Sequence, residues 1–256
     1  MVWRGWPTRI LTVPTSSRFT VLQQPVITRQ SPNRPSHLLA AYSFDTHDGS
    51  DASGRGNTLV SQGAGVSFGS GINASATFGT GDVQSACLTG AGVNMQSAVI
   101  TFMGWINISS AQSGDWVCAF GLHQNSATWP IWGLYPTGGG GGDIVFGSNI
   151  GGGSNLNYGP PSPLTDSWHH IACTYDGNTM QLFVDGIFGS SQQKTDGFDY
   201  TYLGDFHVLG DPNYGTSRMF AGGVDDVRVY DSVLTQADIQ TCMNTPVGMK
   251  ADPLAG

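Results

Sequence analysis

The feature that most constrains the fold is a repeated pattern of short β-prone runs separated by turns rich in glycine, aspartate and asparagine. Branched and aromatic side chains dominate these runs, which begin at residue 38. With 37 glycines and only 11% charged residues, the composition suits an all-β protein with many tight turns. We expect strands within residues 38–44, 99–109, 115–122, 131–136, 142–147, 168–175, 180–186, 202–210 and 222–230. Such spacing is typical of a two-sheet sandwich.

Two local signals add a hairpin and a helix to these strands. In "YDGNTMQLFVDG", Asp176, Gly177 and Asn178 supply a tight turn, and "DG" at 185–186 begins the next one. Residues 234–244 show the pattern of a single short helix with Thr235 as its N-cap.

Charge divides the chain into a basic start and an acidic remainder. Residues 1–36 carry +5 and the remaining residues −13, for a total of −8. Prolines recur in the basic part and favour an extended path. We therefore predict an extended N-terminal arm at 1–36, a sandwich at 37–246 and a tail at 247–256.

The basic arm suits docking on an acidic protein neighbour in a large assembly, and a solvated tail is the alternative. The arginines are too sparse to favour nucleic acid as the partner. The residues expected to hold the partner are Trp3, Arg4, Trp6, Arg9 and Arg18. We expect no secretory signal, since the first residues lack an apolar core. No apolar run approaches the roughly 18–20 residues of a membrane span.

All 18 acidic residues are aspartates, and the chain has no glutamate. This excludes a HExxH metalloprotease, an EF-hand with its bidentate glutamate, and any glycosidase that depends on a glutamate pair. Four cysteines allow three pairings and none has CxxC spacing, so free thiols and disulfides both stay open.

The segments "DSWHHIACTYDGNTMQLFVDG" and "FAGGVDDVRVYDSVLTQADI" resemble the laminin G-like jelly rolls of the concanavalin A-like lectin/glucanase superfamily. Weaker matches extend the resemblance over residues 38–245. The resemblance implies a two-sheet antiparallel jelly-roll sandwich with one short C-terminal helix behind the N-terminal arm. On the "WHH" strand, alternation places His169 and His170 on opposite faces, and the resemblance implies that His170 is the inward, hydrogen-bonded, structural one.

A structural calcium ion is a further expectation. Strict alternation places Asp225 on one face with Val227 and Val229, where a carboxylate needs a partner. Related glucanases bind calcium with the aspartate of a similar "DxVRVY" strand, so the resemblance implies this role for Asp225. The expected oxygen ligands are Asp225, Asp51, Asn57 and Asp45. The alternative is that Asp225 caps backbone amides without a metal.

The resemblance does not extend to catalysis, because the related glucanases use two glutamates. We expect a non-enzymatic protein, and two hypotheses from different classes follow. The first is a capsid-decoration protein on the surface of a virus or phage particle, anchored by the basic arm. The second is a secreted or cell-surface lectin-like module that binds carbohydrate. An aspartate-based glycosidase is a more distant alternative.

Aromatic residues near loops are the candidates for stacking on sugar rings. The expected glycan-binding residues are Trp129, Trp132, Tyr135, Tyr158 and Tyr214. Tyr200 and Tyr202 also lie on expected loops or strand ends. The alternative for each ring, and for Trp132 in particular, is a place in the core. Because of the arm, we prefer the particle-surface hypothesis and a location on the virion, with the extracellular lectin second.

Overall fold

The structure is a computed structural model that describes most of the chain beyond the predicted arm. The described residues are 37–62, 66–69, 75–78, 87–112, 116–125, 130–137, 143–212, 219–250 and 252–255, with only the backbone for 75–78. The predicted arm, with Trp3, Arg4, Trp6, Arg9 and Arg18, lies outside these residues, and the predicted domain boundaries stay a prediction.

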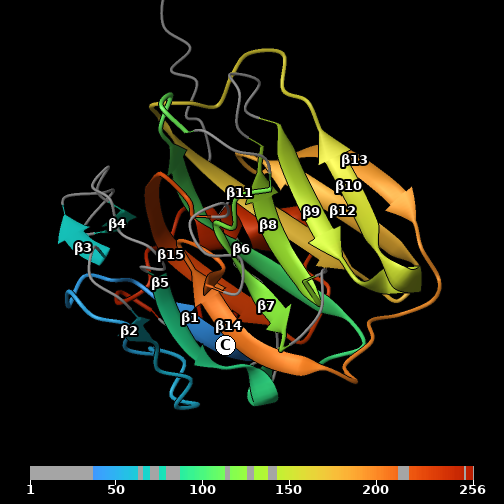
Figure 1. Ribbon diagram of the computed structural model, residues 1–256, viewed down its shortest axis with the longest axis horizontal. Coiled ribbons are helices and arrows are strands. Elements are labelled where there is room, and N and C mark those ends of the chain that lie inside the picture. The colour runs from blue at the N-terminus through green and yellow to red at the C-terminus, as the bar shows by residue number, and fades with distance from the viewer. Residues whose placement is uncertain are drawn as a thin grey trace, which may run out of the picture. The chain divides into compact units, whose positions relative to one another are not determined.

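Two antiparallel sheets lie face to face (Figure 1). In the described part of the chain, the back sheet has the order β13 (Ile187–Gln193), β12 (Thr179–Val184), β11 (Trp168–Tyr175), β6 (Ile100–Ile108), β15 (Gly222–Tyr230), β4 (Ser75–Phe78) and β3 (Val66–Gly69), and β1 (Leu38–Tyr42) also pairs with β15. The front sheet has the order β10 (Ser154–Tyr158), β9 (Ile144–Ser148), β8 (Trp132–Pro136), β7 (Phe120–Gln124), β14 (Leu203–Val208), β5 (Cys87–Ala91) and β2 (Val60–Gln62). Two short 3-10 turns, η1 (Gly92–Met95) and η2 (Ile150–Gly152), are also described.

The main core fills the space between the sheets, because alternate residues of each strand point inward. Phe102 of the back sheet lies at its centre. Its ring stacks on Trp132 at 4.9 Å between ring centroids and meets Phe146 edge-on at 5.0 Å. All three rings are fully buried, and each such side chain contributes about 1.5–3 kcal/mol of burial free energy.

A second, smaller core lies on the outer face of the back sheet, under helix α1 (Gln236–Met243). Ile239 and Cys242 of the helix pack there against residues of the strands. Thr235 is the N-cap: its side chain accepts a hydrogen bond from the Asp238 N–H, and the Asp238 carboxylate accepts one from the Thr235 N–H. This confirms the predicted helix and its start. No helix among the described residues is long and apolar enough to cross a membrane.

The fold confirms the expected jelly-roll sandwich with a short C-terminal helix. It also confirms the hairpins, since β11 pairs with β12 and β12 with β13. No bounds were predicted for β13, the second strand of the later hairpin. The strands that were not predicted are short, polar or rich in glycine: β2, β3, β4, β5 and β10. All four cysteines, Cys87, Cys118, Cys173 and Cys242, are buried free thiols.

The face assignment of Asp225 was wrong because β15 contains a bulge. The pairing of β15 with β6 shifts between Asp225 and Arg228, and Asp226 has a positive φ of 48°. Val224 and Val227 both belong to the main core. The extra residue between them turns Asp225 away from that core, toward the outer face of the back sheet.

Candidate functional site

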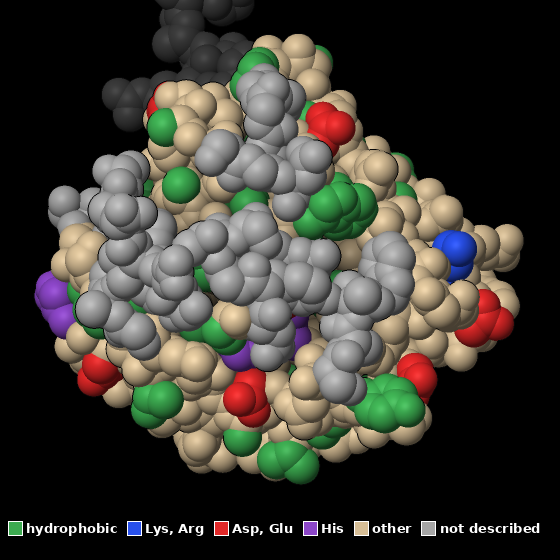
Figure 2. All heavy atoms as spheres, viewed as in Figure 1, with side chains coloured by type: hydrophobic (Ala, Val, Ile, Leu, Met, Phe, Trp, Pro, Cys, Tyr) green, Lys and Arg blue, Asp and Glu red, His purple; other side chains and the backbone are tan. Residues whose placement is uncertain are grey.

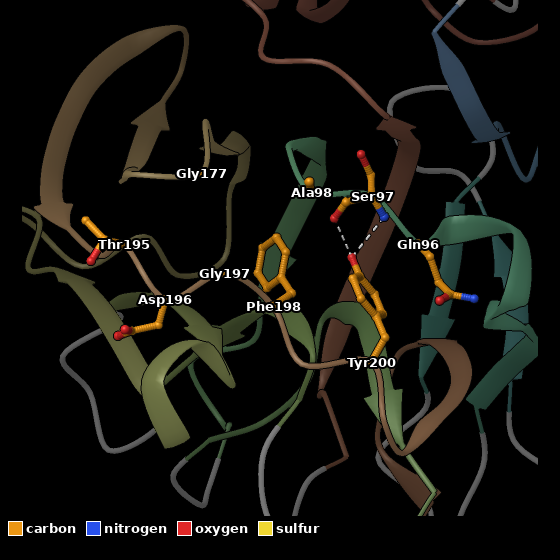
Figure 3. A pocket seen from close by; sticks show the side chains of 9 residues that line it. All are labelled: Gln96, Ser97, Ala98, Gly177, Thr195, Asp196, Gly197, Phe198 and Tyr200. Atoms are coloured by element: carbon orange, nitrogen blue, oxygen red, sulfur yellow. Dashed lines mark hydrogen bonds between the residues drawn. The ribbon is translucent and has the colours of Figure 1, made fainter.

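An open groove of about 510 Å³ lies where β6 begins and β11 ends. Three connections that are far apart in sequence form it: the segment between η1 and β6, the β11–β12 turn, and the β13–β14 connection (Figure 3). The groove is lined by Gln96, Ser97, Ala98, Gly177, Thr195, Asp196, Gly197, Phe198 and Tyr200.

Phe198 provides the apolar surface in the middle of the groove. Its half-buried ring meets Tyr175 edge-on at 4.9 Å and Tyr200 at 6.1 Å between ring centroids. Figure 3 shows the ring between Ala98 on one side and Gly197 on the other. The contacts with the two tyrosines hold the ring in place, so it offers a fixed apolar surface to a ligand.

Hydrogen bonds fix the position of the β13–β14 connection. The Tyr200 hydroxyl donates to the Ser97 carbonyl at 2.7 Å and accepts from the Ser97 N–H at 3.0 Å. The Gly197 N–H donates to the Tyr175 hydroxyl at 3.2 Å. The Asn149 side chain exchanges hydrogen bonds with the backbone N–H and carbonyl of Asp199. The groove is therefore largely preformed, which limits the entropy lost on binding.

Exposed polar side chains surround this aromatic centre. Gln96 offers an amide, Thr195 a hydroxyl and Asp196 a carboxylate. Asp196 lies against Gly151, where an added Cβ would come within 2.7 Å of the Asp196 Oδ2. An aromatic ring beside amide, hydroxyl and carboxylate groups matches the two kinds of surface on a sugar, its C–H face and its hydroxyls.

A second polar cluster lies on the outer face of the front sheet. The His123 Nδ1 lies 2.8 Å from the Asp211 Oδ2, and the His123 Nε2 lies 3.3 Å from both the Cys118 sulfur and the Tyr135 hydroxyl. His207 packs on His123 with ring centroids 4.9 Å apart. In Figure 2 only small parts of histidine side chains are visible over β7 and β14. The sequence did not indicate this cluster, since its residues come from separate strands and loops.

Thiol, imidazole and carboxylate follow one another here in the order found in cysteine hydrolases. However, Cys118 has no exposed surface, and His123 and Asp211 are at most 3% exposed. A substrate cannot touch the Cys118 sulfur in this structure. Burial and the neighbouring His123 lower the pKa of His207 to about 3, so its imidazole stays neutral. The arrangement is a closed, buried network.

The structure separates the expected glycan-binding residues. Trp132 and Tyr135 are at most 1% exposed, so neither ring has a free face for a sugar, and the expectation is corrected for both. Trp132 belongs to the main core, which was the alternative given for it in the sequence analysis. Tyr158 is half-buried at the end of β10. Trp129 and Tyr214 lie outside the described residues.

The expected calcium ligands do not come together as one set. Within the described residues, which include Asp45, Asp51 and Asp225, no three histidine, cysteine or acidic side chains form a group that could hold a metal ion. Both carboxylate oxygens of Asp51 instead accept hydrogen bonds, which come from the N–H groups of Ala41, Ser53 and Asn57 and from the Ser53 hydroxyl. Asp225 accepts a hydrogen bond from the Asp226 N–H. A calcium site built from these four residues does not fit this geometry.

The two adjacent histidines point to opposite faces, as the alternation predicts. The His169 ring bridges Asp185 and Ser167, with 2.9 Å to each. His170 shares a strand face with Ala172, which belongs to the second core, whereas Ile171 belongs to the main core; His170 therefore points to the outer face of the back sheet, which corrects its expected inward direction. It is buried and packs edge-on against Trp105 at 5.4 Å between ring centroids. Within the described residues, neither ring nitrogen of His170 has a hydrogen-bond partner, which corrects the expectation that this histidine is hydrogen-bonded. Burial, followed by the Arg228 charge, lowers the pKa of His170 to about 3.

Sequence reasoning named Tyr200 as a loop aromatic but missed Phe198, Asp196 and Gln96. One signal could have indicated Phe198: in "TDGFDY" an aromatic residue stands between two aspartates in a connection between strands. Which residues face Phe198 depends on the sheet pairing, which the sequence pattern alone does not give.

Comparisons with known proteins agree on the fold. The sequence profile of a laminin G-type family, described as the concanavalin A-like lectin/glucanases superfamily, matches residues 79–240. A search of curated proteins found no significant match.

Among solved structures, similar folds occur in a domain of an enzyme and in toxin domains. Domain 4 of AbnA, an extracellular arabinanase of Geobacillus stearothermophilus solved in complex with arabinotriose, has a TM-score of 0.65 at 18% identity, and the match covers 80% of this chain and 97% of that domain. The binding domain of Paraclostridial Mosquitocidal Protein 1 has a TM-score of 0.63 at 14% identity, with 81% and 52% covered. The binding domain of botulinum neurotoxin DC, in complex with SialylT, has a TM-score of 0.58 at 12% identity, with 81% and 51% covered. The chain thus spans about half the length of both toxin domains.

Proposed function

Because the chain belongs to the laminin G-like group of the concanavalin A-like lectin/glucanases superfamily, we propose that it is a carbohydrate-binding protein without catalytic activity of its own. The observation that carries the proposal is the groove at the end of β11. There, the half-buried ring of Phe198 is surrounded by the exposed polar groups of Gln96, Thr195 and Asp196.

The groove has the two properties that a sugar site needs. The C–H face of a sugar ring packs on Phe198, and the hydroxyls exchange hydrogen bonds with the Gln96 amide and the Asp196 carboxylate. The Tyr200–Ser97 hydrogen bonds hold the two walls together before a ligand arrives. Binding therefore orders few additional side chains.

The similar fold of the arabinanase domain, which was solved with an oligosaccharide, supports this proposal. The composition supports the absence of catalysis, because a chain without glutamate cannot use the two-glutamate mechanism of the related glucanases. The extracellular lectin, which the sequence analysis ranked second, thereby becomes the preferred hypothesis. A particle-surface protein anchored through residues 1–36 stays a prediction, because those residues lie outside the described part of the chain.

Titration calorimetry with arabinotriose, xylotriose, cellotriose and lactose tests the proposal. We expect at least one of these sugars to bind with a Kd below about 1 mM, near 4 kcal/mol of binding free energy. Phe198→Ala should weaken that sugar at least tenfold, since it removes the stacking surface. Gln96→Ala should weaken it about threefold, at the scale of one hydrogen bond.

Tyr202→Ala is the matched control. Tyr202 is an exposed aromatic residue, 56% accessible, that lies close in sequence to the groove without lining it. Its removal should leave the Kd unchanged, and circular dichroism should show all variants folded. The proposal is wrong if no sugar of the panel binds, or if Tyr202→Ala and Phe198→Ala weaken binding equally.

A further inference from the structure

We propose that the groove selects uncharged or amine-bearing sugars and rejects sugars that carry a carboxylate or sulfate, with Asp196 as the residue that sets this selectivity. This inference rests on the proposed carbohydrate-binding function and adds the charge class of the ligand. It follows from the charges in and around the groove.

Asp196 is the charged side chain of the groove lining. It is exposed, and the other lining residues are Gln96, Ser97, Ala98, Gly177, Thr195, Gly197, Phe198 and Tyr200, which carry no charge. In Figure 3 its carboxylate lies beside Thr195, on the opposite side of the groove from Gln96. A ligand that spans the groove therefore meets a negative charge at one end.

A second carboxylate adds to this field. Asp176 immediately precedes Gly177 of the lining. The pKa of Tyr175 is raised, mainly by burial and further by the charges of Asp176 and Asp196. The Tyr175 hydroxyl accepts a hydrogen bond from the Gly197 N–H, so the residue on which both carboxylates act contacts the groove lining directly.

Among the described residues, few cations are available to balance these charges. In the described part of the chain, the basic residues are Arg55, Lys194, Arg228 and Lys250. Arg228 is buried and donates to the carbonyls of Cys242 and Thr245 near α1, and Lys250 donates to the Ala255 carbonyl. Lys194 is adjacent to Thr195 but does not line the groove, and its single charge offsets one of the two carboxylates.

The wider surface of the protein also carries an excess of negative charge. The chain carries −8 overall, and Figure 2 shows more acidic than basic side chains on the described front face. An anionic sugar that approaches the groove is repelled locally by Asp196 and, at low salt, by the surface as a whole. We expect this repulsion to weaken an acidic sugar about tenfold relative to its neutral counterpart.

The experiment compares matched sugar pairs by calorimetry with the full chain at 20 mM and 500 mM NaCl. The pairs are lactose with 3′-sialyllactose, galactotriose with trigalacturonate, and cellotriose with the glucosamine trimer. We expect the neutral member to bind at least tenfold more tightly than its acidic partner at low salt, with a smaller ratio at high salt. The glucosamine trimer should bind at least as well as cellotriose.

Substitutions at Asp196 assign the selectivity to this residue. Asp196→Asn, which is nearly isosteric, should reduce the neutral-to-acidic ratio about threefold, and Asp196→Lys should reverse the preference in at least one pair. Val60→Lys is the control, because it adds a positive charge at an exposed position on β2, at the outer end of the front sheet. It should leave the ratio unchanged.

The outcomes separate this inference from the function on which it rests. If acidic sugars bind the unmodified protein as tightly as their neutral partners, or if Asp196→Asn leaves the ratio unchanged, the selectivity is wrong while carbohydrate binding stands. If no sugar of any pair binds to the unmodified protein or to Asp196→Lys, both proposals are overturned.

Discussion

Two buried histidines carry ring nitrogens without hydrogen-bond partners in the described part of the chain. They are both nitrogens of His170, which packs against Trp105, and the Nδ1 of His207, on the outer face of the front sheet. Burial lowers the pKa of each to about 3. In the unfolded chain both histidines titrate near pH 6.5. Because the unfolded chain binds these protons first, each histidine lowers the free energy of unfolding as the pH falls from about 6.5 toward 3, and has no such effect above that range.

We predict that His170→Leu reduces the loss of stability in acid. Between pH 6.5 and 3 the unfolded chain binds a proton on each histidine that the folded chain does not. Each histidine should then lower the free energy of unfolding by about 1.5 kcal/mol between pH 6.5 and pH 5. Urea unfolding at both pH values should show a smaller difference for His170→Leu than for the unmodified protein.

His47→Ala, which replaces an exposed histidine, is the control and should retain the full difference. Asp226 acts in the opposite direction below pH 6, because burial raises its pKa to about 6, but it is present in every variant. If the free energy of unfolding of His170→Leu falls between pH 6.5 and pH 5 as much as that of the unmodified protein, His170 is not a source of the acid sensitivity.

At the scale of elements, one carboxylate organises the connection between β1 and β2. Asp51 joins the loop to the strand by accepting hydrogen bonds from Ala41 at 3.0 Å and from the N–H groups of Ser53 and Asn57 at 2.9 Å. Asn57 extends the attachment by donating to the Leu39 carbonyl. The loop is therefore held by backbone hydrogen bonds, of the kind that aspartate makes in turns.

We predict that Asp51→Ala lowers the free energy of unfolding by about 2–3 kcal/mol, because it leaves several backbone donors without an acceptor. Asp48→Ala, which removes an exposed aspartate that accepts hydrogen bonds from Thr46 and Ser50, should cost less than about 1 kcal/mol. Urea unfolding measures both values. Because Asp51 is engaged by these donors, EDTA should leave the melting temperature of the unmodified protein unchanged. A decrease with EDTA that calcium reverses would restore the calcium prediction.

At the scale of the whole molecule, charge is distributed unequally between residues 1–36 and the rest of the chain. The predicted arm comprises residues 1–36, whereas the residues that line the groove lie between positions 96 and 200. The anchoring hypothesis and the carbohydrate hypothesis therefore concern different parts of the chain, and each can be tested without the other.

The anchoring hypothesis predicts that only the full chain associates with its partner. Light scattering and co-sedimentation with the source particle should show association of the full chain at low salt and its release at high salt, because surface charge is screened. A chain of residues 37–256 should stay monomeric. If both chains stay monomeric and neither sediments, the hypothesis is wrong.

The amino-acid sequence was sufficient to predict the fold class, the main strands, both hairpins and helix α1 with its cap. These depend on local patterns: alternation along strands, turn residues such as Asp185 and Gly186, and the Thr235–Asp238 spacing. It also determined that His169 and His170 point to opposite faces. A side chain's direction within a regular strand follows from its neighbours alone.

Positions that depend on pairing between distant segments could be assigned only from the three-dimensional structure. The bulge at Asp226 reversed the expected direction of Asp225, since a bulge is an irregularity of pairing with β6. Trp132 is part of the core because its side chain faces the back sheet, where its ring stacks on Phe102. The groove around Phe198 exists because three loops distant in sequence meet at one end of the sheets. Periodicity gives the face of a strand, whereas register and loop packing decide which residues share a site.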